Sequence, residues 1–142
     1  MVWSNLKYDD EIINESSGFH KGFGTFKVEQ NKDVLAFYKK IISVHNSNPA
    51  LLDGDVKFIY SNDETAVFAF ERSDNNERII SVFNTGRNIQ DFEIKLDIKK
   101  FSWQDLLSGI KGTSVNEENS SAGLKVSIPL GSVKIFKINS AE

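Results

Sequence analysis

Cysteine is absent from the sequence, and so are long apolar runs. Without a thiol the protein forms no disulfide bond, no thiolate metal site and no cysteine nucleophile. No apolar stretch approaches the roughly 20 residues that a membrane-spanning helix needs, so we expect no membrane partner. The opening residues Met1–Asn5 lack the basic and then apolar layout of a signal peptide. We therefore favour a cytoplasmic location over a secreted one.

Positive charge and histidine are scarce as well. Lysine and arginine number 17 against 20 aspartates and glutamates, so the basic surface of a nucleic-acid-binding protein is missing and we expect no nucleic-acid partner. The two histidines, His20 and His45, have no second His or Cys at ligand spacing, so we predict no metal site. His45 is interpreted as a packed or capping side chain at the end of a helix. The acidic stretches 9–11, 53–55 and 74–77 are interpreted as turns, because none fits the twelve-residue calcium loop.

The chain does have the size and the apolar content of one globular domain. Its 142 residues are 39% hydrophobic and include 11 phenylalanines, enough for a packed core. Residues 1–30 are rich in loop-forming residues and are expected to be irregular. Loops of that length usually serve a function or lie against another part of a protein, so we expect the chain to be a piece of something larger.

Residues 32–46 are predicted to form a helix. Asn31 is a suitable N-cap, because its side-chain carbonyl can accept a free backbone N–H of the first turn. Pro49 lies just beyond the end, where a proline cannot continue the helix. Apolar residues occupy more of this helix than the single stripe of an ordinary surface helix. Both of its flanks are therefore expected to be covered.

After Pro49 the apolar residues recur every second position, which is typical of β-strands. Short strands with a turn every 8–12 residues indicate an antiparallel sandwich. The fold class is therefore predicted as mainly β: a seven- to eight-stranded antiparallel β-sandwich of Greek-key type, with one α-helix packed on it and an irregular N-terminal segment. The expected strands cover residues 56–60, 65–72, 78–84, 92–98, 103–107, 124–128 and 133–138.

The two tryptophans are the candidate carbohydrate-binding residues. An exposed aromatic ring can stack on the apolar C–H face of a sugar ring. Trp103 begins a strand-like apolar segment, and this position favours burial in the core over sugar binding. The position of Trp3 favours neither interpretation. No Gly-x-Ser-x-Gly motif marks a serine nucleophile, and no catalytic residue is predicted.

Three stretches together resemble the end of α-amylase family enzymes (glycoside hydrolase family 13). Leu35–Leu51 is similar to the last helix of their catalytic barrel, and Gly54 matches the glycine that follows it. Val67–Arg72 and Trp103–Gly109 are similar to strands of their C-terminal β-sandwich, domain C. The opening Met1-Val2-Trp3 also resembles neopullulanases and cyclomaltodextrinases. The resemblance implies that residues 1–50 end a (β/α)8 barrel and that residues 51–142 form the C-terminal sandwich.

This resemblance implies an α-glucan hydrolase as parent but no catalysis by the chain itself. Retaining glycosidases need two carboxylates about 5–5.5 Å apart, and the family carries them on earlier barrel strands. The expected partners are the missing barrel of the same chain and an α-glucan. No cofactor is expected in this chain, and calcium in the parent enzyme is left open. Two alternatives stay open: a free-standing carbohydrate-binding module, and a protein–protein adaptor or dimer that uses the apolar helix face.

Overall fold

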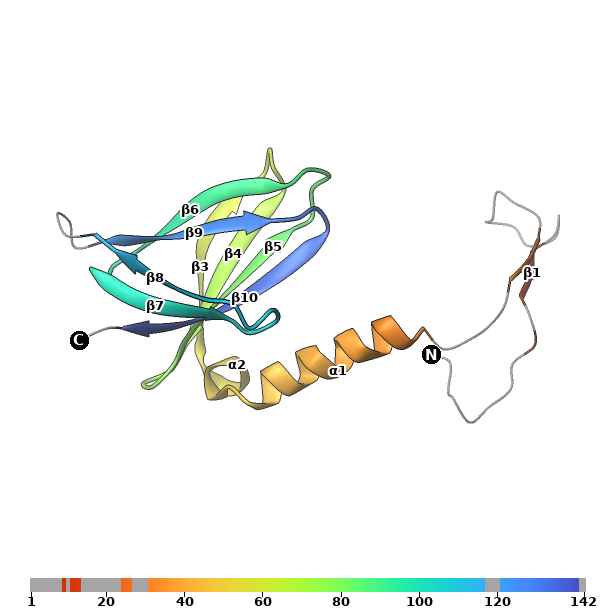
Figure 1. Ribbon diagram of the computed structural model, residues 1–142, viewed down its shortest axis with the longest axis horizontal. Coiled ribbons are helices and arrows are strands. Elements are labelled where there is room, and N and C mark those ends of the chain that lie inside the picture. The colour runs from red at the N-terminus through yellow and green to blue at the C-terminus, as the bar shows by residue number, and fades with distance from the viewer. Residues whose placement is uncertain (1–8, 10, 14–23, 27–30, 117–120, 141–142) are drawn as a thin grey trace. The chain divides into compact units, whose positions relative to one another are not determined.

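A computed structural model places two compact units along the chain (Figure 1), Met1–Lys39 and Lys40–Glu142. It describes residues 9, 11–13, 24–26, 31–116 and 121–140. Trp3 and His20 lie outside the described residues, so their predicted roles stay predictions.

Two short strands lie in the first unit, β1 (Glu11–Ile13) and β2 (Gly24–Phe26). They pair antiparallel, with Ile12 opposite Thr25. The prediction that residues 1–30 are irregular is therefore wrong at these two strands. Three residues are too few to display a two-residue periodicity, which is why the sequence pattern did not indicate them.

Helix α1 (Lys32–Asn46) has the predicted bounds and the predicted N-cap. The side-chain oxygen of Asn31 accepts hydrogen bonds from the backbone N–H groups of Asp33 and Val34, over 3.1 and 3.0 Å. None of the helix residues is buried. Within the second unit, Val44 alone among the α1 residues packs against a core cluster, and Ile42 is 55% exposed. The last turn of α1 thus packs on the sandwich, whereas the expected cover on both flanks of the helix involves a longer polypeptide and stays a prediction.

A second helix, α2 (Pro49–Asp53), was not predicted. Pro49 lies beyond the end of α1, as predicted, and it also begins α2. Proline suits the first helical position because its missing N–H would have no partner there and its φ angle is already helical. Five residues do not make a stable helix on their own, so α2 depends on contacts with the sheet.

The rest of the second unit is a β-sandwich of eight antiparallel strands, which confirms the predicted fold class. One sheet has the order β3-β4-β5-β10-β7-β8, and the other consists of β6 and β9. The strands are β3 (Asp55–Asn62), β4 (Val67–Ser73), β5 (Arg78–Asn84), β6 (Gln90–Leu96), β7 (Lys100–Asp105), β8 (Lys111–Val115), β9 (Ala122–Ile128) and β10 (Ser132–Ser140). Of these, only β8 has no counterpart among the predicted strands. No helix in the described part of the chain is long and apolar enough to span a bilayer.

The main core lies between the two sheets. Alternating residues of both sheets point into it, including Val82, Leu124 and Phe136. Tyr60 of β3 stacks on Phe92 of β6, with the ring centroids 4.5 Å apart, and so joins the sheets at one edge. A second, smaller cluster forms on the opposite face of the six-stranded sheet, where α2 packs. Its buried members are Ala50, Leu51, Ile79 and Ile135.

Candidate functional site

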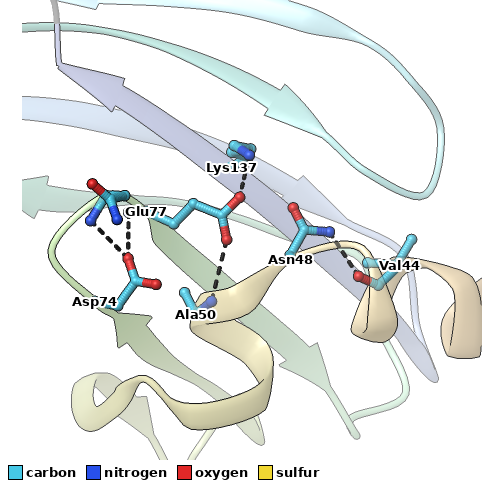
Figure 2. A network of polar contacts seen from close by, with 7 residues as sticks. Val44, Asn48, Ala50, Asp74, Glu77 and Lys137 are labelled. Atoms are coloured by element: carbon cyan, nitrogen blue, oxygen red, sulfur yellow. Dashed lines mark hydrogen bonds and ion pairs between the residues drawn. The ribbon is translucent and has the colours of Figure 1, made fainter.

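The two helices meet the sheet at a junction held by polar contacts (Figure 2). Asn48 separates α1 from α2, and its side chain is almost fully buried. Its Nδ2 donates a hydrogen bond to the carbonyl oxygen of Val44 over 2.6 Å. That carbonyl belongs to the last turn of α1, where backbone oxygens have no partner within the helix. Asn48 thereby closes the end of α1 while its backbone starts α2.

Glu77 is the central residue of this junction. It lies at the end of the β4–β5 loop, and its side chain is only 10% exposed. One carboxylate oxygen accepts the backbone N–H of Ala50 over 3.2 Å, and the other pairs with the ammonium group of Lys137 on β10. A negative charge at the start of a helix also suits the helix dipole. Glu77 therefore caps α2 from a distant part of the sequence and joins it to β10 and to the β4–β5 loop (Figure 2).

The loop that carries Glu77 is itself ordered by Asp74. The Oδ1 atom of Asp74 accepts the backbone N–H groups of Asn76 and Glu77, over 2.7 and 2.6 Å. This Asx-type turn confirms the prediction that residues 74–77 form a hairpin loop. The carboxylate is thus used for turn formation. No group of three or more His, Asp or Glu residues that could hold a metal ion occurs in the described part of the chain.

The other end of α2 is fixed by Arg72 of β4. Its Nη2 atom donates to the carbonyl oxygen of Gly54 over 2.8 Å and, more weakly, to that of Leu52 over 3.4 Å. Gly54 is required by close packing, because a Cβ there would lie 2.5 Å from the Ala50 carbonyl oxygen and 2.9 Å from that of Ser73. Both ends of the short helix are therefore bound to the same sheet.

Next to α2, the outer face of the six-stranded sheet bears a row of aromatic rings. We call this surface the phenylalanine face, and its members are Val56, Phe58, Phe68, Phe70 and Phe83. The pairing register puts them on one side: Val56 lies opposite Arg72, Phe58 opposite Phe70, and Phe68 opposite Phe83. Side chains alternate between faces along a strand, so the neighbours of these residues on β4 and β5 point into the main core.

Trp103, a candidate sugar-binding residue, lies half-buried on β7. Its ring meets Phe136 edge-on, with the centroids 5.5 Å apart, and it packs against the main core. The ring also covers Gly112 on β8, where a Cβ would lie 2.4 Å from the indole. An aromatic ring over a glycine on a neighbouring strand is a known way to stabilise a sheet. A cavity of about 380 Å³ nearby is lined mainly by polar residues such as Ser102, Gln104 and Asn139. Asn139 pairs with Ser102 and Ile138 pairs with Trp103, so these polar side chains lie on the face of the sheet opposite to the Trp103 ring.

His45 does not take the predicted packed position. Its side chain is exposed in the last turn of α1, and Nδ1 lies 3.2 Å from the side-chain oxygen of Asn46. The packed alternative for His45 is therefore wrong, whereas the capping alternative stays a prediction. The helix surface at this point is not covered by the described residues of the second unit, so an apolar position on the helix did not lead to burial.

Comparison with known proteins shows which families and structures the chain is similar to. Residues 56–127 match the family model for the maltogenic amylase C-terminal domain. A cyclomaltodextrinase of Geobacillus thermopakistaniensis (strain MAS1) is 26% identical over 81 residues, which are 57% of this chain and 14% of that protein. The structure of the α-amylase of Geobacillus thermoleovorans in complex with acarbose superposes with a TM-score of 0.66 at 15% identity. It covers 82% of this chain, which spans 25% of that one. A cyclomaltodextrinase structure gives a TM-score of 0.63 at 17% identity, covering 80% of this chain and 19% of its own.

Proposed function

Because the chain belongs to the family of maltogenic amylase C-terminal domains, we propose that it is the non-catalytic C-terminal part of an α-glucan-hydrolysing enzyme and stabilises its catalytic barrel. In this proposal α1 is the last barrel helix, and the sandwich covers apolar barrel surface beside it. The whole enzyme hydrolyses α-1,4-glucosidic bonds, and the chemistry belongs to residues that precede this sequence. The chain spans only 14% of the cyclomaltodextrinase that it matches, which supports a longer parent.

The observation that carries this proposal is the junction of α1, α2 and the sheet. A flexible tether between independent modules has few contacts across it. Here Asn48, Glu77 and Arg72 hold the connection through hydrogen bonds to both helices. A sandwich attached this firmly to the end of a helix can transmit its stability to the structure to which that helix belongs.

The test uses the complete polypeptide encoded by the reading frame that contains this sequence. We expect it to hydrolyse soluble starch, pullulan or β-cyclodextrin, and we expect a form lacking residues 51–142 to unfold at a lower temperature. The 142-residue chain alone is expected to hydrolyse none of the three. Turnover by the pure chain, or a reading frame without a catalytic domain, would show the proposal to be wrong.

The cavity lined by Ser102, Gln104 and Asn139 supports a second candidate function, contact with an α-glucan. Hydroxyl-rich sugars suit a cavity lined by side-chain hydrogen-bonding groups. Titration of the chain with maltoheptaose, followed by tryptophan fluorescence, tests this role. A saturable change that is lost in Asn139→Ala, which keeps both tryptophans, supports a sugar-binding module. An unchanged spectrum at millimolar sugar leaves Trp103 as a packing residue only.

A further inference from the structure

The phenylalanine face exposes large apolar side chains that the packing of the sandwich does not use. Phe58 is 72% exposed and Val56 is 57% exposed, whereas the opposite face of the same strands supplies buried core residues such as Ala69. Single exposed apolar residues are common on protein surfaces, but a contiguous aromatic surface is typical of an interaction site. The face therefore needs an explanation beyond the folding of the sandwich.

The rings of this face already support one another. Phe58 meets Phe70 edge-on at 6.2 Å between centroids, and Phe83 stacks on both Phe70 and Phe68, at 5.6 and 5.0 Å. Three of the four rings are half-buried by these contacts and by the strands beneath. Side chains that are ordered before binding lose little conformational freedom when a partner docks, so such a face is prepared for binding.

The face is continuous with the junction through Arg72. Arg72 lies opposite Val56 and two residues from Phe70, on the same side of the sheet, and it binds the end of α2. Helix α2 packs on that side as well, against Ile79 and Ile135. The polypeptide therefore reaches the sandwich on the face that carries the rings. Any domain that precedes α2 is tethered beside them, and a tether raises the effective concentration of a partner at such a surface.

We propose that the phenylalanine face is the docking surface for the catalytic domain that precedes this sequence in the longer polypeptide. This inference rests on the proposed function and specifies which surface of the sandwich serves it. The similar cyclomaltodextrinase and α-amylase align with this chain over 14% and 25% of their length, and under the proposed function the rest of the enzyme is a large domain joined to the sandwich through α1 and α2. Phe58 is the residue that changes most on docking, because it has the most surface to lose.

Carbene footprinting with mass spectrometry measures this burial directly. The complete polypeptide and the 142-residue chain are labelled under the same conditions, and peptides that contain Val56 and Phe58 are compared with a peptide that contains Ile89. Ile89 is 62% exposed and lies outside the face, so it serves as the matched control. We expect labelling of the first peptide to fall several-fold in the complete polypeptide while that of the control stays the same. Equal labelling of Phe58 in both proteins would overturn the inference.

Two variants separate docking from folding. Phe58→Ser removes one ring contact from the 142-residue chain and is expected to lower the unfolding temperature of the complete polypeptide by clearly more than that of the short chain, whereas Ile89→Ser has the same small effect in both. A Phe58→Ser effect of the same size in both proteins would show that the ring serves only the sandwich. Sedimentation tests another occupant: a dimer of the complete polypeptide that Phe58→Ser dissociates would assign the face to a second copy and overturn the inference. If removal of residues 51–142 destabilises the enzyme but Phe58 stays labelled, the proposed function holds and this inference is wrong.

Discussion

Replacement of Glu77 provides the most direct test of the junction. In Glu77→Ala the backbone N–H of Ala50 loses its acceptor and the Lys137 ammonium loses its partner. Loss of a helix cap costs about 1 kcal/mol, and loss of a hydrogen bond to a charged group costs about 1.5–3 kcal/mol. Lys137 is 31% exposed, so water replaces part of the ion pair and we take the lower end of that range. The expected loss in the free energy of unfolding is about 2–3 kcal/mol.

A loss of this size is easy to measure on the 142-residue chain. For a domain of about 100 residues, each kcal/mol lost lowers the melting temperature by about 4 °C. The melting temperature of Glu77→Ala, measured by circular dichroism, should therefore be about 8–12 °C lower than that of the unchanged chain. Glu77→Gln keeps an acceptor oxygen for Ala50 but loses the charge, so its effect should be smaller. Glu64→Ala is the matched control, because Glu64 is exposed in the β3–β4 turn. A Glu77→Ala protein as stable as the Glu64→Ala protein would refute the assignment of the junction to Glu77.

Three further predictions concern other contacts of the sandwich. Gly112→Ala should destabilise the chain and change Trp103 fluorescence, because the new Cβ would lie 2.4 Å from the indole. Gly123→Ala should be tolerated, because the atoms nearest to its new Cβ belong to the flexible side chain of exposed Glu93. Urea unfolding of both variants checks this, and equal losses would contradict it. Asn84→Ala should cost about 2–3 kcal/mol in urea unfolding, since this buried amide donates over 2.8 and 3.2 Å to two backbone carbonyls, one of them on β9; a loss below 0.5 kcal/mol, the usual size for a surface substitution, would contradict it. Asn48→Ala should lower the helical circular dichroism signal and the melting temperature together, and an unchanged helical signal would count against its role at the end of α1.

Local patterns were sufficient to predict α1 and most strands. The side chain of Asn31 and the apolar spacing that follows it act within one or two helical turns, so the start and end of α1 could be read from neighbouring residues. The strands from β3 to β7 and β9 to β10 either alternate between apolar and polar residues or, as in β4 and β5, form short apolar runs, and both patterns are local enough to be recognised to within a few residues. Such short-range signals decide the type of an element before tertiary contacts form.

The junction could not be predicted, because it depends on contacts between distant residues. Glu77 was interpreted as a turn residue, and nothing in residues 74–77 indicates that its carboxylate caps a helix 27 positions earlier in the chain. For the same reason α2 escaped prediction. Strand β8 was missed because Lys111–Val115 has little apolar alternation. Its place beside β7 depends on the packing of Trp103 over Gly112, which is a property of the folded sheet.

The near-continuous apolar character of β4 and β5 has a clearer meaning once the sheet is known. Strands with apolar residues on both faces are typical of sheets that are covered on both sides. One face of these strands packs on β6 and β9, and the other carries Phe68, Phe70 and Phe83. These two strands therefore have the composition of a sheet covered on both sides, while the described residues of the second unit cover the outer face only at α2.

The position of β10 in the sheet has a consequence for synthesis of the protein. β10 is the last strand in chain order, yet it lies between β5 and β7 at the centre of the six-stranded sheet. A ribosome-bound chain that ends before Ser132 can form the β3–β4–β5 meander, but the open edge of β5 has no partner until β10 emerges. Domains generally fold in the order in which they are made. The sandwich is thus completed only when its final strand leaves the ribosome, after any preceding domain has had time to fold.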